Sequence, residues 1–346
     1  MTTRLHVWSP ASPDDMSGLE AALAELDGSA TNLCVFGKVE GPATLNDYAR
    51  HLAVARCEET IRAHGGPALL ARTFRLFSTG CEGIATPVMA LLADVPDDTG
   101  DIDDAPRLVF GAARSAPVPL ADRAGLAHIE ATAATVEEAL AAAGLSPDDA
   151  ALVLVKSPVL PISAETHPER RRHAGSTGSS RGAGALGVAL ALGETEIAAL
   201  GEDPVGRSPE FSRRAMVYSG TEADCVEVLV LGERPGAGGD LRIATALLAD
   251  LLDTPAAAAL AADTGAAELV LFKAGIGSDG RLRGRRTTVF GSDLTADKQL
   301  RAAASGAIGA WFGTTAAFIS GGAEHQGPDG ACLAAAIYST LTPAER

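Results

Sequence analysis

The feature that most limits the possible folds of this chain is an order of three residue types that recurs three times. Each recurrence begins with a short apolar run that ends in a lysine: "NLCVFGK" to Lys38, "ALVLVK" to Lys156 and "ELVLFK" to Lys273. Runs of this length, rich in Val, Leu and Phe, predict buried strands. An arginine that opens or enters an alanine-rich, helix-prone stretch follows, and then a second β-prone run that ends in serine. The arginines are Arg50, Arg181 and Arg301, and the serines are Ser78, Ser219 and Ser320.

Two segments with the composition of linkers separate the recurrences. They are "DVPDDTGDIDDAP" (94–106) and "GERPGAGGD" (232–240), which contain Pro and Gly. Boundaries at these segments give three repeat units, residues 1–100, 101–236 and 237–346. A single lysine or Ser-Gly turn carries no functional information, but three ordered recurrences indicate a repeat architecture whose residues converge. We therefore expect an α/β protein built from three similar units.

The composition excludes several classes of partner. The formal net charge is −16, and such a surface repels phosphate backbones and anionic lipid, so neither nucleic acid nor a membrane is an expected partner. The five cysteines are scattered and never spaced as CxxC, which argues against a disulfide framework or a zinc site. The N-terminal residues lack a signal-peptide pattern, and no apolar run has membrane-spanning length. These observations favour a cytoplasmic enzyme or binding protein.

The three residue types suggest a chemistry if the units pack about a pseudo-threefold axis. Serine hydroxyls, neighbouring backbone N–H groups and arginine forks would then surround a small, flat ligand with several carbonyl oxygens. A lysine can take the proton of a serine if burial and neighbouring cations lower the pKa of its amine. The expected reaction is acyl transfer, in which serine attacks a carbonyl carbon and water completes the hydrolysis.

The chain resembles the ring-opening cyclic amide hydrolases, the cyanuric acid hydrolase and barbiturase family. The resemblance covers nearly the whole chain and is carried by "GKVEGPATLNDYAR" (37–50), "VKSPVL" (155–160), "SRGAGALGVALALGE" (180–194), "LRGRR" (282–286) and "SGGAEHQGPDG" (320–330). It implies three homologous α/β units around a pseudo-threefold axis, in the shape of a triangular prism. It also implies a homotetramer.

The resemblance further implies a role for each site residue. The catalytic pair belongs to the second unit and consists of Ser219 and Lys156. The expected substrate is cyanuric acid, a planar ring with three carbonyls, and its opening gives carboxybiuret, which loses carbon dioxide to form biuret. Barbituric acid, also a ring with three carbonyls, or a related cyclic imide is the alternative substrate. A non-catalytic ligand-binding relative is the alternative from another class. The residues implied in substrate binding are Lys38, Arg50, Ser78, Thr79, Arg181, Gly220, Lys273, Arg301, Ser320 and Gly321.

The resemblance also implies a structural divalent cation near the C-terminus and no organic cofactor. Backbone oxygens of the loop after the third serine would hold it, and ligation by oxygen alone favours Mg²⁺ or Ca²⁺. A carboxylate after the third lysine is expected to assist, but Gly275 stands there. The alternative interpretation of the loop is a plain turn. The implied ligands are Ala323, Gln326, Gly327, Pro328 and Gly330.

The second unit leaves its alignment open. The first and third serines precede a glutamate by four residues, whereas Ser219 precedes Glu222 by three. If the strand ends set the alignment, Ser219 takes the nucleophile position; if the glutamate sets it, Tyr218 does. A slip of one residue turns a side chain to the opposite face of a sheet. The strand-based alignment is favoured, because Gly220 can absorb a shorter turn.

Overall fold

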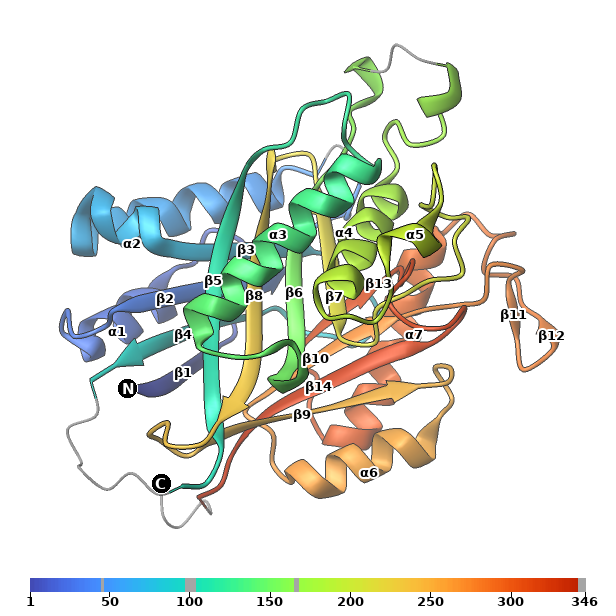
Figure 1. Ribbon diagram of the computed structural model, residues 1–346. Coiled ribbons are helices and arrows are strands. Elements are labelled where there is room, and N and C mark those ends of the chain that lie inside the picture. Colours follow the sequence, from blue (N-terminus) through green and yellow to red (C-terminus); the bar gives the residue numbers. More distant parts are fainter. Residues whose placement is uncertain (45–46, 97–103, 165–167, 342–346) are drawn as a thin grey trace.

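The computed structural model describes residues 1–44, 47–96, 104–164 and 168–341. The described residues form three four-stranded sheets of equivalent topology and one short hairpin (Figure 1). The strand orders are β1-β4-β2-β3, β5-β8-β6-β7 and β9-β14-β10-β13. In each sheet the second and third strands of the order given are antiparallel, and the last pair is parallel. The expected α/β protein of three similar units is confirmed, and each sheet lies within one of the three repeat ranges.

The strands and helices have the following bounds. The first sheet contains β1 (Thr2–Trp8), β2 (Asn32–Val39), β3 (Thr73–Thr79) and β4 (Val88–Val95). The second contains β5 (Arg107–Pro117), β6 (Ala150–Pro158), β7 (Ala215–Gly220) and β8 (Cys225–Arg234). The third contains β9 (Leu241–Leu248), β10 (Leu269–Ala274), β13 (Ala317–Gly321) and β14 (Cys332–Ser339), and the hairpin joins β11 (Arg281–Leu282) to β12 (Arg285–Arg286). The helices are α1 (Ser17–Leu26), α2 (Ala49–Arg72), α3 (Leu126–Ala143), α4 (Thr177–Ala191), α5 (Ile197–Leu200), α6 (Thr254–Thr264) and α7 (Ala296–Phe312).

Each sheet buries both faces, one against the other two sheets and one against helices. Figure 1 shows the helices on the outside, with α3 and α4 over the second sheet. Phe36, Leu154 and Leu271, from the middle strands, meet in one central core. Val35 lies one residue before Phe36, and Val155 lies one residue after Leu154. These two valines belong to separate cores beneath the helices. Alternation along a strand produces this division, and each fully buried side chain of this size stabilises the fold by roughly 1.5–3 kcal/mol.

The alternation also fixes the direction of the three lysines. Lys38, Lys156 and Lys273 each lie two residues after a side chain of the central core, so they point toward the same centre. Each arginine lies near the start of the helix that follows the lysine strand, on α2, α4 and α7. The expected order of strand, helix and strand is therefore confirmed. Among the described residues, no helix combines the length and apolar character needed to cross a membrane.

Candidate active site

Three buried lysines form the base of the site. Lys38, Lys156 and Lys273 are at most 4% exposed. Burial, followed by repulsion from Arg301, lowers the pKa of Lys38 to about 7. Burial and then Arg181 lower the pKa of Lys273 well below its ordinary value. An amine with such a lowered pKa can accept a proton near neutral pH, as the expected chemistry requires.

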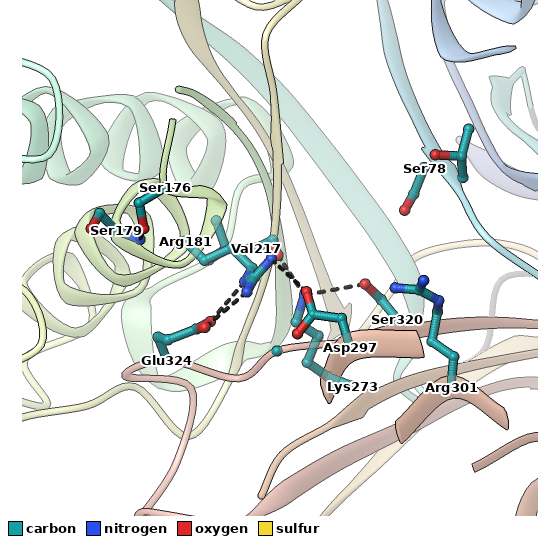
Figure 2. Close-up of polar contacts among 12 residues, drawn as sticks. Ser78, Ser176, Ser179, Arg181, Val217, Lys273, Asp297, Arg301, Ser320 and Glu324 are labelled. Atoms are coloured by element: carbon teal, nitrogen blue, oxygen red, sulfur yellow. Dashed lines mark hydrogen bonds and ion pairs between the residues drawn. The ribbon is translucent and has the colours of Figure 1, made fainter. Parts of the chain in front are cut away.

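Two of the three serines contact a lysine across the sheet. Ser78 lies opposite Lys38 and Ser320 lies opposite Lys273 in the parallel strand pairs. The distances from lysine Nζ to serine Oγ are 3.1 Å in the first unit and 3.3 Å in the third. Figure 2 shows that Ser78, Ser320 and the Arg301 guanidinium group approach one another. Both pairs have the geometry of a nucleophile and its base.

The second unit differs from the favoured alignment. Lys156 lies opposite Tyr218 on β7, and Ser219 lies opposite Ser157, the next residue of β6. The Tyr218 ring belongs to the central core, 5.0 Å from the Phe318 ring in an edge-to-face arrangement. Burial raises the pKa of its phenol. The alignment that placed Ser219 opposite Lys156 is therefore corrected: Tyr218 takes the position that serine takes in the other units.

A five-residue pattern explains this register. The segments "STGCE" (78–82), "YSGTE" (218–222) and "SGGAE" (320–324) align without a gap, with glycine third and glutamate fifth. Gly80 and Gly322 have φ of +98° and +81° and lie against arginine side chains that a Cβ atom would approach within 3 Å. A Cβ on Gly220 would approach the carboxylate of Glu222 at 2.3 Å. The second unit therefore has a substituted serine and no missing residue.

The glutamates of this pattern bind the three predicted arginines, each across a unit boundary. Arg301 forms a two-point contact with Glu82, including 2.7 Å from Nη2 to Oε1. Arg181 donates to Glu324 at 2.7 and 2.8 Å, as Figure 2 shows. The third contact joins Arg50 Nε to Glu222 Oε1 at 3.5 Å. A cyclic arrangement results, in which the arginine of one unit meets the glutamate of another.

Glu222 also pairs with the lysine of its own unit. Lys156 Nζ contacts Glu222 Oε1, and the Glu222 side chain is only 11% exposed. Burial raises the pKa of Glu222, but attraction to Lys156 and Arg50 outweighs it and the pKa falls to about 2. Burial lowers the pKa of Lys156, and Glu222 opposes that shift. Lys156 is therefore part of a buried ion pair with the carboxylate of its own unit.

The remaining predicted contact residues lie beside these groups. The Thr79 carbonyl accepts from Lys38 Nζ at 2.6 Å. A Cβ on Gly321 would approach the Asp297 carbonyl at 2.5 Å, which leaves space only for glycine. Asp297 also contacts Arg181 at 3.3 Å. Asp297 and the three glutamates were not predicted as site residues. The equal interval of four residues from serine to glutamate in the first and third units indicates Glu82 and Glu324.

Two of the backbone oxygens proposed for a cation, those of Ala323 and Pro328, accept hydrogen bonds within the loop, and the side chain of Gln326 is also engaged. The Gln326 side-chain oxygen accepts from Val217 N at 2.8 Å, and Gln326 is fully buried. The Ala323 carbonyl accepts from Gln326 N at 3.0 Å, and the Pro328 carbonyl accepts from Ala331 N at 2.9 Å. Gly327 and Gly330 adopt positive φ angles, as a tight turn requires. These hydrogen bonds are those of a turn, as the alternative interpretation of the loop expects, and the cation stays a prediction.

Gly275 is packed too closely to be replaced by a carboxylate residue. A Cβ atom there would lie 2.1 Å from the Ala331 carbonyl, and Gly275 N donates to Cys332 Sγ at 3.3 Å. In the described part of the chain, no cluster of three or more His, Cys, Asp or Glu side chains could hold a metal.

Three similar α/β units with buried Ser–Lys pairs at their centre fit the class of hydrolases that act on small amides. Comparison with known proteins gives the family. The family model described as amidohydrolase ring-opening protein matches residues 4–339, and the chain belongs to this family. It is a hydrolase of the cyanuric acid amidohydrolase type, acting on cyclic amides.

Individual relatives agree with this assignment. A cyanuric acid amidohydrolase of Azorhizobium caulinodans is 37% identical over 342 residues, which cover 94% of this chain and 95% of that protein. Barbiturase 1 of Nocardioides sp. is 33% identical over 333 residues, covering 88% and 90%. The crystal structure of the cyanuric acid hydrolase from A. caulinodans superposes with a TM-score of 0.89 at 34% identity, covering 98% of this chain and 99% of that one. The resemblance and the expected fold are confirmed.

Proposed function

We propose that this chain hydrolyses cyanuric acid, opening the ring to carboxybiuret by Ser–Lys acyl transfer. The observation that carries the proposal is the pair of serine–lysine contacts at 3.1 and 3.3 Å in a cationic centre. The cyanuric acid amidohydrolase that is 37% identical supports the choice of ring. Carboxybiuret would then lose carbon dioxide to give biuret.

The reaction needs one serine and one neutral lysine. The serine Oγ forms a bond to a ring carbonyl carbon while its proton passes to lysine Nζ. The ring C–N bond then breaks, and the lysine returns the proton to the departing nitrogen. Water attacks the resulting acyl-serine with lysine as base, which releases the open-chain acid and restores the hydroxyl. Arginine and lysine donors around the centre stabilise the negative oxygen that forms at each attack.

Barbituric acid is the second candidate substrate, which Barbiturase 1 at 33% identity favours. It shares the planar ring and three carbonyls, but one ring position is carbon. A ligand-binding protein without turnover is the alternative that Tyr218 favours, because Tyr218 fills one of the three hydroxyl positions.

One assay separates these candidates. Purified protein is mixed with cyanuric acid or barbituric acid, and the loss of ring ultraviolet absorbance is followed together with release of the open-chain product. We expect turnover of cyanuric acid with a higher kcat/KM than that of barbituric acid. The reverse order would identify a barbiturase, and binding without turnover of either ring would refute catalysis. The implied homotetramer is tested separately by sedimentation of the same preparation.

A further inference from the structure

We propose that the nucleophile of this chain is Ser78 in the first unit, with Lys38 as its base, and not Ser219 in the second. The inference rests on the proposed function, since it assigns that reaction to one particular pair. It begins with the second unit, in which both members of the expected pair are otherwise engaged.

Ser219 lies on the wrong face of its strand. Met216 and Tyr218 point into the central core, whereas Val217 belongs to the core beneath the helices. Alternation along β7 therefore places Ser219 on the face of Val217. Its neighbour across the sheet, Ser157, donates to the Ser180 carbonyl of α4 at 2.8 Å, on that same outer face.

Tyr218 and Lys156 do not replace the missing pair. The Tyr218 hydroxyl donates to Met216 Sδ at 3.5 Å, away from the ionic groups, and burial keeps the phenol protonated. Lys156 forms a buried ion pair with Glu222. A carboxylate partner favours the protonated form of a lysine, and in that form the lysine cannot accept a proton from a nucleophile.

The first and third units retain both groups, and two observations favour the first. Ser78 is half-buried, whereas Ser320 is only 6% exposed. Lys273 Nζ lies 4.7 Å from the centre of the Tyr218 ring and donates to the Val217 carbonyl at 2.6 Å. The substitution in the second unit therefore also places an aromatic ring against the lysine of the third unit.

Lys38 has no such aromatic contact among the described residues. It donates to Thr79 O at 2.6 Å and to Ser78 Oγ at 3.1 Å. Cavities of about 510 and 430 Å³ lie beside the loops that follow Ser78 and Ser320, respectively. A small molecule can therefore reach both loops, and the two units differ in how exposed the serine side chain is.

The atoms of the step balance within the first unit. Ser78 Oγ bonds to the ring carbonyl carbon, its proton passes to Lys38 Nζ, and the ring C–N bond breaks as Lys38 protonates the departing nitrogen. Water then gives a proton to Lys38 and its oxygen to the acyl carbon. The ester bond to Ser78 breaks, and Lys38 returns the proton to the serine oxygen.

The first experiment compares turnover of cyanuric acid by Ser78→Ala, Ser219→Ala and Ser320→Ala, each one oxygen smaller than the natural residue. We expect Ser78→Ala to lose about 10³-fold or more in kcat, as for other acyl-transfer nucleophiles. Ser219→Ala should retain kcat within about threefold. Loss of turnover in Ser219→Ala or Ser320→Ala, with turnover retained in Ser78→Ala, would overturn the assignment.

The second experiment does not depend on turnover, and its main result comes from the natural protein. The natural protein is treated with phenylmethanesulfonyl fluoride, which sulfonylates activated serines, and the modified residue is located by peptide mass spectrometry. We expect the label on Ser78 and its absence in Lys38→Met. A label on Ser219 or Ser320, or none on Ser78, overturns the assignment. If Ser78 is labelled but neither ring is hydrolysed, the proposed function fails while the assignment of the nucleophile stands.

Discussion

Replacing Lys38 with methionine should make the protein more stable near neutral pH while abolishing turnover. Methionine fills the same aliphatic path, but it removes an amine that is 1% exposed and donates to Thr79 O and Ser78 Oγ at the distances given above. Burial of that amine holds its pKa at about 7 against an ordinary value of 10.5. The folded state therefore disfavours the proton that the unfolded chain binds readily.

The size of this effect follows from the two pKa values. Each pKa unit corresponds to about 1.4 kcal/mol, so the full cost of burying Lys38 is about 5 kcal/mol below pH 7. Between pH 7 and 10.5 the unfolded state binds a proton that the folded state lacks, so stability rises with pH. The cost falls from about 4 kcal/mol at pH 7 to about 1 kcal/mol at pH 10. Loss of the hydrogen bond to the Thr79 carbonyl subtracts about 1–3 kcal/mol, at every pH, from the free energy of unfolding that Lys38→Met gains.

Urea unfolding of the natural protein and Lys38→Met at pH 7 and pH 10 measures this difference directly. The free-energy difference between the two proteins should change by about 3 kcal/mol over this range, because the other titrating groups are common to both. Lys298→Met, at the half-buried fourth lysine of the chain, is the matched control. A difference that stays constant from pH 7 to pH 10 would refute the argument that burial lowers the pKa of Lys38.

Three other outcomes are expected. Tyr218→Ala should lower the free energy of unfolding by about 3–5 kcal/mol, through the cavity that it leaves, whereas Tyr218→Phe should change it by less than about 1 kcal/mol; urea unfolding compares them, and equal effects would contradict the packing role of the ring. Glu222 has a pKa of about 2 against 4.5, so its pair with Lys156 contributes about 3 kcal/mol above pH 4.5 that is lost as the pH falls toward 2. Glu222→Gln should therefore have a lower free energy of unfolding than the natural protein at pH 7. The difference between the two proteins should narrow to about 1 kcal/mol by pH 3, whereas a difference independent of pH would exclude the ion pair. Dialysis against a chelator should leave the thermal midpoint unchanged, since two of the proposed oxygen ligands, those of Ala323 and Pro328, are already hydrogen-bonded within the turn; a lower midpoint that Ca²⁺ or Mg²⁺ restores would demonstrate the cation.

The repeat was predictable because a strand end places the same residue type at the same depth in every unit. Lys38, Lys156 and Lys273 end apolar runs, and such runs predict buried strands without knowledge of their partners. The direction of each lysine toward the centre then follows from alternation alone. The arginines were found for a similar reason, since each lies near the start of an alanine-rich helix.

The second unit could not be predicted in the same way, because its register depends on contacts between units. The run "AMVYS" ends in serine like its two counterparts, and that likeness favoured Ser219. The position of β7 agrees instead with the contacts of Glu222, which pairs with Arg50 and Lys156, two residues far from it in the sequence. A glutamate five residues into the pattern carries the register, because its carboxylate must meet an arginine from a neighbouring unit.

The cyclic arrangement of arginine–glutamate contacts has a consequence for how the molecule unfolds. Arg50 meets Glu222, Arg181 meets Glu324, and the arginine of the third unit returns to the glutamate of the first. Removing any one unit takes the glutamate partner from one buried arginine and the arginine partner from one glutamate, and an unpaired buried cation typically costs several kcal/mol. A fragment containing one or two units therefore lacks ion-pair partners in its interior, as well as the surface that the missing unit would provide. The whole chain should unfold in a single cooperative transition, despite having three separate helix-covered cores.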